Sequence, residues 1–239
     1  TNSTHGSSNF GGSIQANVSA NTTAGFSIVS WTGNGSDATI GHQLNAAPKM
    51  IIHKHRSGSV QWNVYHANTG TGGYLRIDGD NSFSSNSGFF GTTPTSTVFS
   101  PGSHSYMSGS GNNNIAYCFA DVKGYLKIGS YTGNGNNDGV FVYTGFKPAW
   151  IMLKNTSNSQ NWYIYDNKRT PNNFANYHFY ADLGNAEAGG STLGIDILSN
   201  GWKIKTSNDG WNGSGENYIF MAFAESPFVT STGIPTTAR

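Results

Sequence analysis

The chain has 239 residues, enough for one large or two small domains, and its formal net charge is +1. Only 10% of the residues are charged, and no Lys/Arg cluster provides the basic stripe that nucleic-acid binders need, so we expect no nucleic-acid partner. Aromatic residues reach 13%, which argues against charge-driven disorder, and 32 glycines are typical of a β-rich chain with many tight turns.

The chain contains two similar segments about 100 residues apart. The motif WTGNG at 31–35 returns as YTGNG at 131–135, and FAD at 119–121 returns as FAE at 223–225. A unit of this length matches one small domain. A residue that changes character between the two copies is a weak candidate for the shared scaffold. Between 48 and 65, seven positions carry the same residue in both copies: Pro48/Pro148, Ile51/Ile151, Lys54/Lys154, Ser57/Ser157, Ser59/Ser159, Trp62/Trp162 and Tyr65/Tyr165.

In chain order, residues 1–24 are rich in Asn, Ser, Thr and Gly, which predicts a polar linker or a strand that pairs with a partner. Alternating residues predict a strand at 26–31, followed by turn chemistry at 32–37. A β-hairpin is predicted at 49–55 and 60–66, and its second copy at 149–155 and 160–166. Further strands are predicted at 74–78, 96–99, 114–120, 178–183, 193–198, 202–206 and 217–224.

Short strands at regular spacing, without a sustained helical period, predict an all-β fold. We expect two tandem sandwich-like or jelly-roll-like repeats of about 100 residues at 25–123 and 124–228, followed by an extended tail at 229–239. Continuous apolar runs near the end of each copy predict central strands buried on both faces. The residues expected in the core are Ile51, Ile151, Phe119 and Phe223.

Targeting signals are not evident in the sequence. The chain lacks an initiator Met, a signal peptide and an apolar run long enough to span a bilayer, so we expect a processed product or a piece of a longer polypeptide, with no membrane insertion.

Metal-binding patterns are weak. His53, His55 and His66 share the first predicted hairpin, but their counterparts Leu153, Asn155 and Asp166 favour a packing role over a zinc site. Asp78, Asp80 and Asn81, and the loop 134–138, are rich in oxygen ligands but lack the spacing of an EF-hand. We expect neither a metal nor another cofactor.

Catalytic patterns are also weak. Glycoside cleavage needs two nearby carboxylates, yet Glu187, Glu216 and Glu225 stand alone, and no nucleophile elbow or phosphate loop occurs. The single cysteine, Cys118, corresponds to Ala222 and is expected to be a buried core thiol. We therefore expect that the chain is not an enzyme.

Aromatic residues on polar loops are the best candidates for contact with a ligand, because rings stack on sugars and Asn and Asp bind hydroxyl groups. The aromatics shared by both copies are more simply explained as scaffold. Trp211, in the loop 208–213, is the strongest unshared candidate, and Phe90 is a weaker one. The predicted ligand-binding residues are Trp211, Asn208, Asp209, Asn212 and Tyr106.

Several blocks resemble a repeat family found in structural proteins of marine bacteriophages, particularly tail fibres and other virion appendages. These blocks are APKMIIHKH with WNVYHA (47–67), AYCFADVKGYLKIGSYTGNG (116–135), DGVFVYTGFKPAWIMLKNT (138–156), NWYIYDNKR (161–169), GIDILSNGWKIKTS (194–207), NYIFMAFAESPF (217–228) and GIPTTAR (233–239). The resemblance covers residues 25–239 and supplies no catalytic residues.

The resemblance implies a β-rich module displayed on the virion surface, with other virion proteins as partners. A fibre or appendage module that contacts host-surface glycans is the leading hypothesis, and a homo-oligomer, such as a trimer, fits such a fibre. Two alternatives stay open: a purely structural virion decoration without a ligand, and a polysaccharide-degrading appendage.

Overall fold

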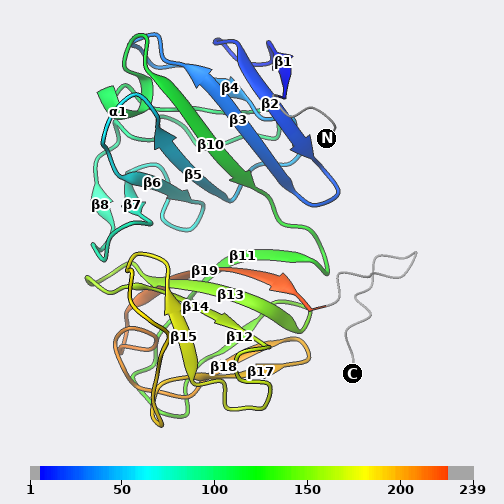
Figure 1. Ribbon diagram of the computed structural model, residues 1–239, viewed down its shortest axis with the longest axis vertical. Coiled ribbons are helices and arrows are strands. Elements are labelled where there is room, and N and C mark those ends of the chain that lie inside the picture. Colours follow the sequence, from blue (N-terminus) through cyan, green and yellow to red (C-terminus); the bar gives the residue numbers. More distant parts are fainter. Residues whose placement is uncertain (1–5, 226–239) are drawn as a thin grey trace. The chain divides into compact units, whose positions relative to one another are not determined.

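The computed structural model describes residues 6–225, which form two compact units (Figure 1). Among these residues, unit 1 comprises 6–77 and 83–121, and unit 2 comprises 78–82 and 122–225. Helix in the described part is confined to α1 (Ser105–Ser108), which has four residues and cannot cross a membrane. The predicted all-β fold is confirmed. The predicted tail at 229–239 lies outside the described residues.

The main sheet of unit 1 has eight antiparallel strands, and its described N-terminal part supplies the first two. The part of 1–24 that is described therefore pairs within its own unit, through β3. In sheet order, the strands are β1 (Ser7–Asn9), β2 (Ala16–Asn21), β3 (Phe26–Thr32), β10 (Asn113–Phe119), β5 (Met50–His55), β6 (Trp62–His66), β7 (Gly73–Arg76) and β8 (Ser84–Ser85).

The main sheet of unit 2 has six antiparallel strands. Its order matches that of the six strands from β3 to β8 in unit 1. The register matches as well, because Asn113 faces Thr32 in unit 1 and Asn217 faces Thr132 in unit 2. In sheet order, the strands are β11 (Leu126–Thr132), β19 (Asn217–Ala224), β13 (Pro148–Asn155), β14 (Trp162–Asp166), β15 (Tyr177–Tyr180) and β16 (Ala188–Gly189).

A smaller sheet covers one face of each main sheet and closes a sandwich. In unit 1 it is formed by β4 (Ile40–Gly41) and β9 (Val98–Phe99). In unit 2 it is formed by β12 (Phe141–Tyr143), β18 (Gly201–Ile204) and β17 (Ile195–Leu198). Buried residues of both sheets share one core in each unit, which is the arrangement of a β-sandwich.

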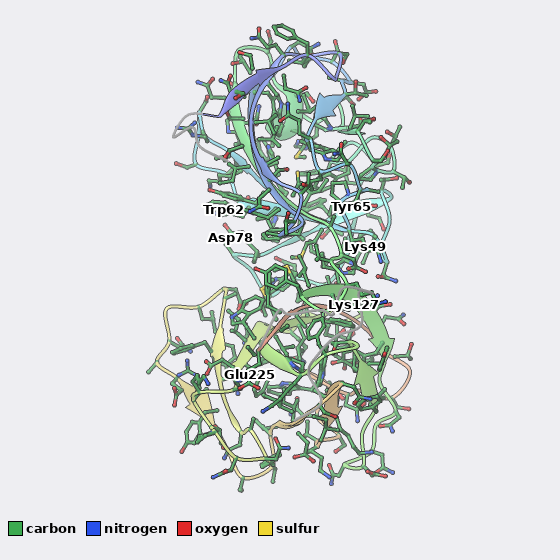
Figure 2. All side chains as sticks on the ribbon, turned by 90° about the vertical axis from the view of Figure 1, so that its right-hand side faces the viewer. Lys49, Trp62, Tyr65, Asp78, Lys127 and Glu225 are labelled. Atoms are coloured by element: carbon green, nitrogen blue, oxygen red, sulfur yellow. The ribbon has the colours of Figure 1, made fainter. Side chains whose placement is uncertain are left out.

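Most of the aromatic residues shared by the two copies are core residues. Tyr65, Tyr165 and Trp162 are buried, whereas Trp62 is half-buried. Figure 2 labels Trp62 and Tyr65, whose positions on β6 have opposite parity and therefore lie on opposite faces of the sheet.

The predicted core residues are correct in two of four cases. Ile51 and Ile151 are fully buried. Phe119 and Phe223 are only half-buried, so their prediction as core residues was wrong. Each follows the buried Cys118 or Ala222 by one position, and alternation turns its ring to the outer face of the sheet.

An acidic residue that follows each central strand within two positions has the same structural role in both units. Asp121 forms an ion pair with Lys49 at 2.7 Å, and Glu225 forms one with Lys147 at 3.0 Å. Figure 2 labels Lys49 and Glu225. These acids therefore stabilise the scaffold, because each links the end of a central strand to the start of the neighbouring strand.

Candidate functional site

The candidate site lies where four strands of unit 1 come together at one corner of the main sheet. Ala16 on β2 faces Trp31 on β3, Trp31 faces Asn114 on β10, and Asn114 faces His55 on β5. All four side chains are buried on the inner face. Because side chains alternate along an extended chain, a residue adjacent to each of these four points outward. These outward, exposed residues are Gln15, Thr32, Asn113 and Arg56.

Hydrogen bonds hold this outer row in place. The Thr32 hydroxyl donates to Oδ1 of Asn113 at 3.2 Å, which leaves the Nδ2 group of the same amide available as a donor. The backbone N–H of Asn113 donates to Oγ of Ser57 at 2.8 Å, and the N–H of Arg56 donates to the carbonyl of Asn113 at 2.7 Å. The turn after β5 is thus fastened to the start of β10, which positions Arg56 beside Asn113.

A groove of about 560 Å³ runs along this corner, and we call it the β2–β10 groove. Its described lining contains amide, hydroxyl, aliphatic and indole groups, one guanidinium and no carboxylate. Arg56 is exposed and forms no ion pair with any residue in 6–225. The groove therefore presents neutral hydrogen-bonding groups and one uncompensated positive charge. Its lining residues are Ile14, Gln15, Ala16, Asn17, Ser30, Trp31, Thr32, Arg56, Asn113 and Asn114.

A buried polar cluster lies beneath the groove. Nε2 of His53 is 3.0 Å from Oδ1 of Asn114, and the rings of His53 and Trp31 are 5.6 Å apart. Burial lowers the pKa of His53 to about 4, so its imidazole is neutral at pH 7 and Nε2 donates to the Asn114 carbonyl oxygen. Within the described chain, Nε1 of Trp31 and Nδ1 of His53 are buried without a hydrogen-bond partner.

Unit 2 has the same backbone framework at this corner but different side chains. Thr132 donates to Asn217 at 3.2 Å, and the N–H of Asn217 donates to Ser157 at 2.9 Å, as in unit 1. Thr156 replaces Arg56, and Tyr131 replaces Trp31. The described main sheet of unit 2 begins at β11, without counterparts of β1 and β2. The β2–β10 groove is thus a feature that distinguishes unit 1.

The ligand-binding residues predicted from the sequence are partly buried and partly exposed, and they belong to both units. Trp211 is 3% exposed and packs against Tyr163 at a ring-centroid distance of 4.0 Å, which corrects the prediction that it offers an open ring to a ligand. Asn212 is also buried, and its Nδ2 group donates to Asn134 and Asn136 in the loop 134–138 and to the carbonyl of Thr206. This residue is therefore a structural connection between loops.

Three predicted residues do lie at the surface. Asn208 and Asp209 are exposed, but Oδ1 of Asn208 accepts the N–H of Gly210 at 2.8 Å and stabilises the turn. Tyr106 belongs to unit 1, is 40% exposed and lies edge-on to His104. Tyr106 is thus in a different unit from the loop 208–213. Phe90, the weaker candidate, is buried.

Sequence reasoning missed both the groove and the exposed aromatic rings. The contrast between Arg56 and Thr156 in the two copies was the available signal for the groove. The aromatic residues with well-exposed side chains carry no signal in the sequence, since exposure depends on which face of a strand they occupy. In the described chain they include Phe10, Phe141, Tyr143 and Tyr177.

The remaining candidates have structural partners. Within residues 6–225, no three His, Cys, Asp or Glu side chains gather as a metal site requires. In the loop 134–138, Asn134 and Asn136 accept backbone N–H groups and Asp138 pairs with Lys203 at 2.8 Å. Burial raises the pKa of Cys118 to about 12, which makes this thiol unreactive.

The isolated glutamates also bind to neighbouring side chains. Glu187 pairs with Arg169, Glu225 pairs with Lys147, and Glu216 accepts from the Tyr218 hydroxyl at 3.0 Å. Their carboxylates are therefore used in structural contacts.

Comparison with known proteins gives a family without an assigned function. Residues 1–227 match the family described as "Domain of unknown function (DUF7483)", and the chain belongs to this family. A search of curated proteins and a search of solved structures each found no match.

Proposed function

We propose that this member of the DUF7483 family is a bacteriophage virion module, part of a tail fibre or another appendage, that binds glycans on the host surface. The observation that carries the binding role is the β2–β10 groove, a hollow of about 560 Å³ lined mainly by hydrogen-bonding side chains. The virion setting is supported by the sequence resemblance alone. The module would lie on the virion surface, with other virion proteins as partners.

The groove chemistry is suited to sugars. Amide and hydroxyl groups of Asn17, Ser30 and Asn113 can exchange hydrogen bonds with the hydroxyl groups of a pyranose ring. Such a site binds weakly on its own, because each hydrogen bond replaces one made to water. Display of several copies on an oligomeric fibre would raise the overall strength of attachment.

Binding without cleavage is the favoured form of this role. Glycoside hydrolysis uses a pair of carboxylates that flank the scissile bond. The described lining of the β2–β10 groove includes no Asp or Glu. We therefore propose a receptor-binding module that does not cleave its ligand. Release of reducing ends from host polysaccharide by the purified chain would contradict binding without cleavage.

The test is binding of the labelled, purified chain to cells of candidate marine host bacteria, with soluble host polysaccharide as competitor. We expect saturable binding that the competitor removes, for the monomer or for a multimeric form. A chain that binds no host in either form would contradict the proposal and favour a purely structural decoration.

A further inference from the structure

We infer that the β2–β10 groove selects glycans that carry carboxylate groups, such as uronic acids, and that Arg56 binds the carboxylate. This inference rests on the proposed glycan-binding function and names the class of sugar that it takes.

Several cations of the described chain have no ion pair, among them Lys54, Lys123 and Lys154, but Arg56 is the one of these that lines the β2–β10 groove. Arg169 pairs with Asp166 at 3.0 Å and with Glu187, and Lys203 pairs with Asp138 at 2.8 Å. Arg56, by contrast, lines the groove and forms no ion pair within residues 6–225. A carboxylate entering the groove would supply the missing opposite charge.

The groove also lacks groups that would repel an anion. Its described lining contains no carboxylate, and the Asn113 amide is oriented by Thr32 so that Nδ2 remains a donor. The Arg56 guanidinium and the Asn113 amide therefore offer N–H donors next to each other, which suits a ligand that carries an anionic acceptor group.

The Arg56 guanidinium is better suited to a carboxylate than to a sulfate ester, because a carboxylate spreads its charge over two oxygens and is the stronger base, whereas a sulfate ester spreads its charge over three. Arginine presents parallel N–H groups in a plane, and these match the two oxygens of a carboxylate in a bidentate pair. A lysine at the same position keeps the charge but loses this match. Arg56→Lys therefore separates recognition of shape from attraction by charge alone.

Unit 2 provides an internal reference for this site. The hydrogen bonds of Thr32 and Asn113 recur at Thr132 and Asn217, but Thr156 stands where unit 1 has Arg56. A ligand that required only the shared framework would bind both units. A ligand that requires the guanidinium would bind unit 1 alone.

The experiment is isothermal titration of the full chain with three probes: oligogalacturonate as carboxylate sugar, a sulfated dextran oligosaccharide, and neutral dextran oligosaccharide. We expect binding of oligogalacturonate in preference to the other two. Arg56→Gln should weaken it on the order of tenfold, as expected for loss of a hydrogen bond to a charged group. Arg56→Lys should also weaken it, and Lys123→Gln, an exposed charge outside the groove, should leave the affinity unchanged.

Any one of four results would overturn the inference. These results are equal binding of neutral dextran, preference for the sulfated probe, unchanged affinity in Arg56→Gln, or no binding of oligogalacturonate. Thermal denaturation of each variant shows that it is folded, which is expected because Arg56 is exposed. Host polysaccharide is titrated in parallel, since its binding without any effect of Arg56 would leave the proposed function standing and remove only the carboxylate preference.

Discussion

Trp211 and Trp31 show how the same residue type takes different roles according to its surroundings. Both are buried, with 3% and 4% of their surface exposed. Trp211 is enclosed by aromatic rings that include Tyr163 and His178. Trp31 also packs in a core, against Phe99, but additionally lines the β2–β10 groove. Sequence alone could not show that Trp211 is buried, because the irregular loop 208–213 lacks the alternation that assigns a residue to a face.

Replacement of Trp211 by Ala should destabilise unit 2 by about 3–5 kcal/mol, because the change leaves a large cavity next to Tyr163. The check is chemical denaturation followed by a probe in unit 2. Tyr106→Ala, at an exposed aromatic in unit 1, is the control, and its effect should stay within about 0.5 kcal/mol. A stable Trp211→Ala protein with weakened glycan binding would instead restore this residue as a ligand contact.

The buried His53 should make stability depend on pH. Its pKa is about 4 in the folded chain, against an ordinary value of 6.5. Between these two values the unfolded chain binds more protons, so the free energy of unfolding falls as the pH is lowered from about 6.5 to about 4. The contribution is on the order of 1–3 kcal/mol.

His53→Leu, which introduces the residue of the second copy, tests this dependence. We expect denaturation curves measured from pH 7 to pH 4 to show a smaller loss of stability for the variant than for the native chain. An identical pH dependence in both proteins would show that His53 is not the titrating group.

At the level of elements, the strands were largely predictable and their partners were not. The alternation in 26–31 and the hairpin at 49–66 predicted β3, β5 and β6 to within two residues at each end. For 1–24 the sequence predicted either a linker or a strand that needs a partner, because the apolar residues that alternate in β2, Ala16, Val18 and Ala20, are small and few. β2 is nevertheless a strand, since pairing with β3 buries Ala16 and Val18.

The TGNG turns join the end of β3 and of β11 to the loop before the neighbouring central strand, β10 or β19. The N–H of Gly35 donates to the carbonyl of Ser108 at 2.7 Å, and the N–H of Gly135 donates to that of Asn212 at 2.8 Å. The backbones approach so closely that a Cβ on Gly33 or Gly133 would lie 2.4 or 2.2 Å from a carbonyl oxygen. This contact explains why both copies have glycine here.

Gly133→Ala should therefore cost about 1–3 kcal/mol through overpacking, although alanine is otherwise a mild substitution. Gly184→Ala serves as the matched control, since a Cβ there meets nothing within 4 Å. Thermal denaturation of the two variants checks the prediction. Equal stability of the two variants would mean that the turn moves to accommodate the added Cβ and does not require glycine.

At the scale of the whole molecule, the two units share a framework and differ at the candidate site. The sequence repeat predicted equivalent strands. It could not predict that β2 would pair with β3 in unit 1 and line one side of the β2–β10 groove. The lining of the groove comes from four strands that are up to about 100 residues apart in the chain, and only the sheet order brings them together. This is why local sequence patterns pointed to the loop 208–213 instead.

The difference between the units predicts the binding stoichiometry. One chain should bind one glycan segment, because Thr156 replaces Arg56 and the described sheet of unit 2 has no equivalent of β2. Titration calorimetry with a short oligosaccharide that binds should give one site per chain. Two equal sites would show that the shared framework is sufficient for binding.

The central claim is that the β2–β10 groove is the glycan-binding site, and the matched pair Asn113→Ala and Asn217→Ala tests it most directly. Each change removes the same amide from the same framework, Asn113 in unit 1 and Asn217 in unit 2. The measurement is the affinity of both variants for host-surface polysaccharide, relative to the native chain. We expect Asn113→Ala to weaken binding several-fold, about the value of one or two hydrogen bonds, and Asn217→Ala to leave it unchanged. Equal affinities, or a loss only in Asn217→Ala, would contradict the claim.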